Sequence, residues 1–208
     1  MQKHTTIALF GALVLSVGIL GAYGFASGSS LLNAQSATQT TGNVPMLGHV
    51  TLTVTDPQGN ILAYHQGDNV VVNQAEDCLS QKVFGIPSHL CPSGGAVYNV
   101  IALGNYTGIN IAGKTNSTLA AEEHVAQGLG RQTANTQTET DATTLLPVSD
   151  VLQAQFTNGG TANTVDEAGL FNSTTYNSVG MFARQTFTGI TLNNGDSLTV
   201  KWTVTMGT

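Results

Sequence analysis

The chain has 208 residues, enough for one large domain, and its hydrophobic content of 41% supports a real core, but only 9% of its residues are charged. Its formal net charge of −6 rests on few ionised groups, because lysine and arginine together number only six. Such a composition provides neither a basic patch for nucleic acid nor a polybasic run for an anionic membrane. We therefore expect no nucleic-acid partner.

The N-terminal residues look like an export signal. A short positive start at Lys3 precedes an apolar run from about residue 7 to residue 25, and small residues follow it. This pattern predicts a secretory signal peptide over residues 1–26. The run is also close to the roughly 18 residues that a spanning helix needs, so a retained anchor helix is the alternative. Either way we expect a secreted or cell-surface protein that meets a membrane only through this segment.

The rest of the chain divides into a tail and one domain. Residues 27–47 are polar, low in charge and without periodicity, which is typical of a flexible tail. From residue 48 the pattern changes to short alternating segments, so we expect a single domain over residues 48–208.

The first alternating segment is VTLTVT at residues 50–55, which places Val50, Leu52 and Val54 on one face of a half-buried strand. The turn residues DPQGN and the following ILAYHQ predict a hairpin partner for it. Valines 70–72 form a further short strand candidate.

Two segments have the pattern of short helices. Residues 73–84, NQAEDCLSQKVF, predict one helix with Asn73 as its cap. Residues 118–127 predict a second short helix that ends at the glycines of GLG.

Most of the remaining chain reads as strands. The last one, SLTVKWTVTM at residues 197–206, alternates most clearly, and the preceding NNGD is typical of a hairpin turn. In total, about seven to nine short strands separated by Gly/Asn turns predict an all-β protein, an Ig-like or jelly-roll β-sandwich with one or two short helices. The other candidates are residues 96–104, 151–157, 165–171 and 180–187, and the apolar face of the last strand carries Leu198, Val200, Trp202, Val204 and Met206.

Residues 108–115, GINIAGKT, match the phosphate-loop pattern G-x-x-x-x-G-K-[ST]. A working phosphate loop lies between a strand and a helix of a parallel sheet, and such a sheet requires repeated crossover helices. The chain beyond Arg131 has almost no helical pattern. We therefore interpret the match as coincidental and expect a surface loop.

Other chemistry is equally weakly supported. The five histidines lack metal-ligand spacing, and the one pairing considered, His49 with His65 across the first hairpin, is explained as well by exposed polar positions. The adjacent acidic pairs point apart, and no nucleophile motif is present. We expect no enzyme activity, no cofactor and no metal.

Two covalent features fit an exported chain. Cys78 and Cys91 are the only cysteines and are expected to form a disulfide worth roughly 3 kcal/mol, the alternative being two buried thiols. Three N-x-[ST] tripeptides make Asn105, Asn116 and Asn172 candidates for N-linked glycans.

The C-terminal third resembles known proteins. Residues 167–171 read EAGLF, residues 181–184 read MFAR, and residues 195–203 read GDSLTVKWT. These strings resemble the closing strands of virion and tail-associated β-sandwich proteins. With the export signal, the low charge and the Thr/Asn-rich surface, the chain looks more like subunits of archaeal extracellular filaments of the thread or bundling-pilus type. The resemblance covers residues 48–73 and 165–207.

That resemblance implies a homopolymer assembled by donor-strand complementation, in which an N-terminal strand of one subunit fills a groove in the next. The donor is expected in residues 27–47, or else in residues 49–55, where Val50, Leu52 and Val54 would be its anchors. The alternative is a monomeric tethered or secreted surface sandwich, such as an adhesin, a carbohydrate-binding domain or a virion-like structural protein.

Overall fold

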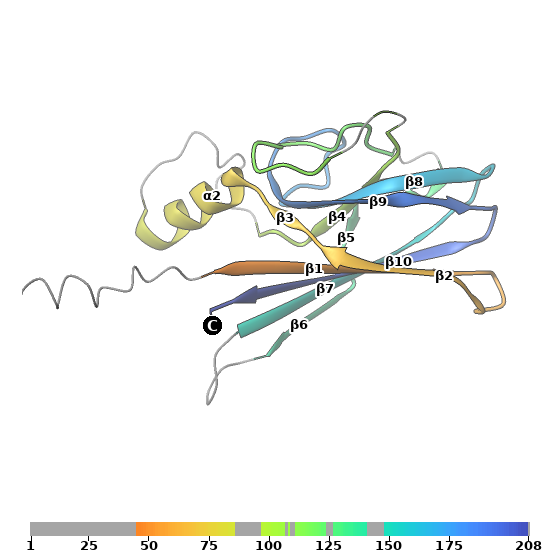
Figure 1. The fold of residues 1–208 in the computed structure, drawn as a ribbon, viewed down its shortest axis with the longest axis horizontal. Helices are drawn as coiled ribbons and strands as arrows, with labels where there is room; N and C mark the ends of the chain where they lie inside the picture. The colour runs from red at the N-terminus through yellow and green to blue at the C-terminus, as the bar shows by residue number, and fades with distance from the viewer. Residues whose placement is uncertain are drawn as a thin grey trace, which may run out of the picture. The chain divides into compact units, whose positions relative to one another are not determined.

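The computed structural model describes residues 45–85, 97–106, 108, 111–123, 127–140 and 148–207. The chain divides into two units, Met1–Asn43 and Val44–Thr208, and the expected signal and most of the expected tail lie outside the described residues. In its described residues, the second unit is a sandwich of two antiparallel sheets of five strands each, with one helix (Figure 1). The prediction of an all-β sandwich is confirmed, and the described part of the chain has ten strands rather than seven to nine.

The first sheet, called sheet A, has the order β2-β1-β10-β7-β6. The second, sheet B, has the order β3-β9-β8-β4-β5. The strands of sheet A are β1 Met46–Thr55, β2 Ile61–Asp68, β6 Thr136–Thr140, β7 Val148–Thr157 and β10 Ser197–Met206. The strands of sheet B are β3 Val70–Val71, β4 Val100–Gly104, β5 Gln132–Thr133, β8 Asn163–Phe171 and β9 Met181–Leu192.

The centre of sheet A is the antiparallel pair β1–β10, whose register runs unbroken from Met46↔Met206 to Thr55↔Ser197. Alternation puts the apolar side chains of both strands on the inner face, where Leu52 and Trp202 are 1% and 0% exposed. Burying a side chain of this size stabilises the fold by roughly 1.5–3 kcal/mol. The predicted inward face of the last strand is therefore confirmed.

The predicted helix is confirmed as α2, Asn73–Phe84, but its cap differs from the expectation. The N-cap residue is Val72, in an extended conformation and without a side-chain capping bond. The first turn of the helix is instead stabilised by a distant segment, because the N–H of Asn73 donates to the carbonyl of Lys114 at 2.8 Å. Gly85 ends the helix at φ 68°, a left-handed conformation that favours glycine.

The second expected helix does not form within residues 118–123, the described part of that segment before residue 127. Glu122 makes an isolated antiparallel bridge to Gly104, and Leu119 is buried. Local propensity is therefore overridden by tertiary contacts.

The NNGD turn is local turn chemistry, as expected, but it does not close a hairpin. The N–H of Asp196 donates to the carbonyl of Asn193 at 3.1 Å, and Gly195 has φ 88°. However, β9 belongs to sheet B and β10 to sheet A, so the turn carries the chain across the sandwich. A turn motif specifies only the reversal of the chain, whereas the choice of partner strand is made by the core.

The first hairpin is confirmed, with a register irregularity at Val54/Thr55. Asp56 organises its turn: one carboxylate oxygen accepts the N–H of Gln58 at 2.9 Å and of Asn60 at 2.8 Å. The hydrogen bond from the Asn60 side chain, followed by the one from its backbone N–H, lowers the pKa of Asp56. Both bonds favour the ionised form of the carboxyl.

We expect Leu52→Ala to lower the free energy of unfolding by about 3 kcal/mol, because it leaves a cavity at the centre of the core. The matched control is Thr53→Ala on the outer face of the same strand, which should stay within about 0.5 kcal/mol of the parent. Urea unfolding followed by tryptophan fluorescence measures both. Equal losses would show that the two faces of β1 are not distinct.

We also expect Asp56→Asn to destabilise the protein at neutral pH. Since the folded-state pKa lies below the ordinary value of 3.8, the contribution of the carboxylate is present above that value and lost as pH falls through the folded pKa. The difference in unfolding free energy between parent and variant should therefore shrink in acid. A difference that stays constant from neutral pH into the acid range would contradict this role.

Candidate functional site

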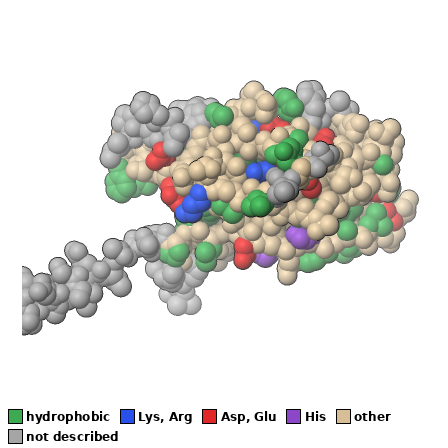
Figure 2. Space-filling model, turned by 45° about the horizontal axis from the view of Figure 1, so that its top comes forward, with side chains coloured by type: hydrophobic (Ala, Val, Ile, Leu, Met, Phe, Trp, Pro, Cys, Tyr) green, Lys and Arg blue, Asp and Glu red, His purple; other side chains and the backbone are tan. Residues whose placement is uncertain are grey.

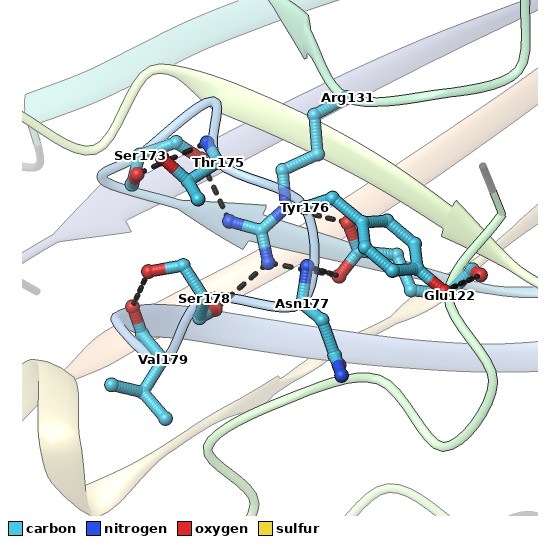
Figure 3. A network of polar contacts seen from close by, with 8 residues as sticks. All are labelled: Glu122, Arg131, Ser173, Thr175, Tyr176, Asn177, Ser178 and Val179. Carbon is cyan, nitrogen blue, oxygen red and sulfur yellow. Dashed lines mark hydrogen bonds and ion pairs between the residues drawn. The ribbon is translucent and has the colours of Figure 1, made fainter. Parts of the chain in front are cut away.

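A buried ion pair joins Arg131 to Glu122 (Figure 3). The side chains of Arg131 and Glu122 are 2% and 1% exposed, and Arg131 Nε donates to Glu122 Oε1 at 2.7 Å. Nη2 of the same arginine donates to the other carboxylate oxygen at 2.9 Å. The pair is therefore bidentate, the strongest arrangement of these two groups.

This pair fastens the turn that connects β8 to β9. Arg131 donates to the backbone carbonyls of Ser173 at 2.7 Å and Ser178 at 2.8 Å, and the N–H of Asn177 donates to Glu122 at 3.2 Å. Figure 3 shows the guanidinium enclosed by these groups. All three guanidinium nitrogens of Arg131 therefore donate hydrogen bonds to groups of the same chain.

A second buried pair joins β8 to β9. Arg184 Nε donates to Glu167 Oε2 at 2.9 Å, and the two side chains are 4% and 0% exposed. Glu167 also accepts the N–H of Ala121 at 2.9 Å, and Arg184 donates to Asn116 at 3.0 Å. The irregular segment 111–123 is thereby fixed against sheet B.

Close approach at this point requires a glycine. A Cβ at Gly104 would lie 2.4 Å from Glu167 Oε1 and 2.7 Å from the backbone oxygen of Ala121. Arg131 and Arg184 are the only arginines of the chain, and both lie in buried ion pairs. Each of them positions backbone or side-chain groups of a neighbouring segment.

Among the described residues, no group of three or more His, Cys, Asp or Glu side chains could hold a metal ion. His49 contacts Asp68 at 3.0 Å on the outer face of sheet A. His65 instead packs on Phe187, with ring centroids 5.8 Å apart. The two histidines therefore have separate partners and do not face each other.

The phosphate-loop string lies against α2. Lys114 approaches Glu76 at 3.6 Å, and the N–H of Gly113 donates to the side chain of Asn116 at 2.7 Å. No helix follows it within the described residues 111–123. The string thus lacks the strand–loop–helix context that phosphate binding needs.

The covalent candidates have different surroundings. Cys78 is fully buried and disulfide-bonded, while Cys91, the only other cysteine of the sequence, lies outside the described residues. Among the sequons, Asn105 and Asn116 are half-buried, and the Asn116 amide oxygen already accepts two hydrogen bonds. Asn172 is only 5% exposed, which argues against a glycan at this position of the folded domain.

The donor-strand anchors considered for residues 49–55 lie within their own subunit. Val50, Leu52 and Val54 are each 1% exposed, in a strand paired on both sides, with β2 and with β10. Transferring this strand to a neighbour would break two ladders and open the core. It is therefore an integral core strand of its own domain.

One side of the sandwich does have unpaired edges. β9 runs from Met181 to Leu192, yet β3 pairs with it only at Ala183 and Arg184. Among the described residues, the remaining edge of β9, residues 185–192, has a partner only on the β8 side. On the same side β2 is the outermost strand of sheet A, and Gly67 and Gln185 are close neighbours across the two sheets.

Sequence reasoning missed this site. β9 reads as a strand, but nothing in its residues tells that half of it lacks a second partner. Phe187 and Ile190 lie there partly buried against the core. Exposed Thr188 and Gly189 separate these two residues, so β9 does not alternate strictly here and its sequence carries no signal for a free edge.

Comparisons with known proteins do not identify the chain: no protein-family model, no curated protein and no solved structure matches it. Within the residues that the structure describes, no helix has the length and apolar character needed to cross a membrane.

We expect Arg131→Met to lower the free energy of unfolding by about 3–5 kcal/mol, because it strands a buried carboxylate. The matched control is Lys114→Met, which removes a cation from an exposed pair and should cost less than about 1 kcal/mol. Chemical denaturation measures both variants. If Arg131→Met unfolds like the control, the buried ion pair does not hold the fold.

Proposed function

We propose that this chain is a structural subunit of an extracellular filament that polymerises by strand donation between copies. The residues ahead of Met46, within the expected tail 27–47, serve as the donor, and the edge of β9 at residues 185–192 serves as the acceptor. The observation that carries the proposal is this acceptor edge, where a strand of sheet B has a partner on one side only.

The physical reason is that an unpaired edge presents a row of N–H and C=O groups able to bind another strand. Phe187 and Ile190 offer apolar contacts beside that row. An added strand would pair with the backbone and cover both side chains at once.

The position of β1 supports the N-terminal tail as the donor. Because β1 begins at Met46 and is paired on both sides, the residues before it are not needed to complete their own sheet. The tail has no alternating apolar pattern, so its contribution to strand donation would come mainly from backbone hydrogen bonds to the acceptor edge.

The surface chemistry also suits a polymer. The face shown in Figure 2 is mostly uncharged, with few acidic or basic side chains between the polar ones. Copies with such surfaces come together with little electrostatic repulsion, in keeping with a chain that is only 9% charged. A carbohydrate-binding surface is less well supported, because the single tryptophan, Trp202, is fully buried.

The test uses the full chain in its producing cells. Electron microscopy of sheared material should show thin filaments, and mass spectrometry should identify this chain as their main component. Phe187→Lys, which puts a charge at the acceptor edge, should abolish the filaments, and deletion of residues 27–43 should do the same.

The matched control is Val83→Lys, which places the same charge on an exposed residue of α2, outside the acceptor edge, and should leave polymerisation intact. Thermal unfolding of both lysine variants separates loss of assembly from loss of fold. Filaments formed by the deletion variant, or by Phe187→Lys at the parental level, would overturn the proposal.

A further inference from the structure

The edge of β2 is a second unpaired edge with a different character. Within the described residues β2 pairs only with β1, over Ile61–Asp68. Three of its large side chains are strongly exposed: Ile61 at 68%, Leu62 at 53% and Tyr64 at 60%. Exposed hydrophobic residues on a free edge strand are typical of a protein interface.

The other outermost strands of the two sheets are protected against pairing with a further strand, whereas β2 is not. β3 and β5 have two residues each, and β6 has five, all polar and including Glu139. Short length and charge are the devices that proteins use to prevent edge pairing. β2 has eight residues without lysine, arginine or proline, and its one acidic residue, Asp68, stands at its end.

We propose that β2 pairs with the β2 strand of a second copy of this chain, antiparallel across a two-fold axis at Tyr64. A two-fold interface uses the same patch on both partners, so the patch must be self-complementary. With the axis at Tyr64, residues 61–67 of the two copies pair, and Leu62 lies opposite Gln66 of the second copy.

Charge selects the antiparallel arrangement and a second copy as the occupant. In a parallel pair the two Asp68 side chains would approach each other, and like charges directly opposite are destabilising. In the antiparallel pair each Asp68 falls opposite the neutral Asn60 of the other copy. The rest of the edge has no acidic residue, lysine or arginine, which disfavours a strongly basic or acidic partner and lets a second copy approach without like-charge repulsion.

This interface uses β2 of sheet A and the acceptor edge uses β9 of sheet B, so the two involve different backbone groups on the same side of the sandwich. Strand donation would join copies along a filament, whereas β2 pairing would join two copies side by side. The inference therefore does not depend on polymerisation.

Single cysteines test the register in the full chain. In oxidised samples, Tyr64→Cys should form a disulfide-linked dimer, because residues at the axis face their own copies at about 5 Å. Leu62→Cys and Gln66→Cys should not cross-link alone but should do so when the two variants are mixed. Val83→Cys, at a residue 69% exposed on α2, is the matched control for random collision.

Tyr64→Lys measures the interface without cross-linking. It should weaken association at least about tenfold in analytical ultracentrifugation, because it opposes two lysines at the axis and removes two aromatic rings. Val83→Lys, with the same change in charge, should leave association unchanged.

The outcomes separate the two proposals. Filaments without disulfides between β2 strands would overturn this inference and leave strand donation standing. Disulfides between β2 strands in a chain that forms no filaments would support it and count against strand donation. Cross-linked peptides that join residue 64 to the tail or to β9 would overturn β2 self-pairing.

Discussion

The antiparallel pairing of β1 with β10 is the interaction on which the rest of the sandwich depends. It joins strands from opposite ends of the described chain along ten residues without interruption, and its inner face brings Leu52 and Trp202 into the core. With these two strands side by side in sheet A, β2 lies at the edge next to β1, and β7 occupies the other side of β10. β9, although it directly precedes β10, therefore has no place beside it and belongs to sheet B.

The two buried Arg–Glu pairs solve a different problem, which is how to hold long irregular connections in a nearly uncharged protein. Backbone groups in a loop need partners when they are buried. Arg131 and Arg184 supply those partners for the β8–β9 turn and for the segment 111–123, while Glu122 and Glu167 balance their charge. Because breaking a buried ion pair is costly, we expect each pair to favour one arrangement of its loop over the alternatives.

The same arrangement explains why one side of the sandwich remains open. After β2 the chain crosses from sheet A to sheet B, where β3 pairs with β9 at only two residues. The later part of β9 is therefore left with a free edge beside β2. Neither edge, residues 61–68 of β2 or 185–192 of β9, contains the lysine, arginine or proline that often blocks pairing, and the one acidic residue is Asp68 at the end of β2. An isolated domain would gain nothing from leaving both edges unprotected, whereas a subunit that meets its own copies would use them.

The sequence by itself determined the fold class, the helix at residues 73–84, the first hairpin and the inward face of β10. All of these depend on local periodicity or on turn chemistry, which a short segment contains in full.

Only the tertiary structure decided which strand pairs with which. The NNGD turn was expected to close a hairpin but crosses between the sheets, Val50, Leu52 and Val54 are core residues of their own subunit, and residues 118–123 are not helical because Glu122 and Leu119 are held by distant contacts. Strand order and open edges arise from contacts between residues far apart in the chain, and the period of a strand contains no information about which neighbour it will find or lack.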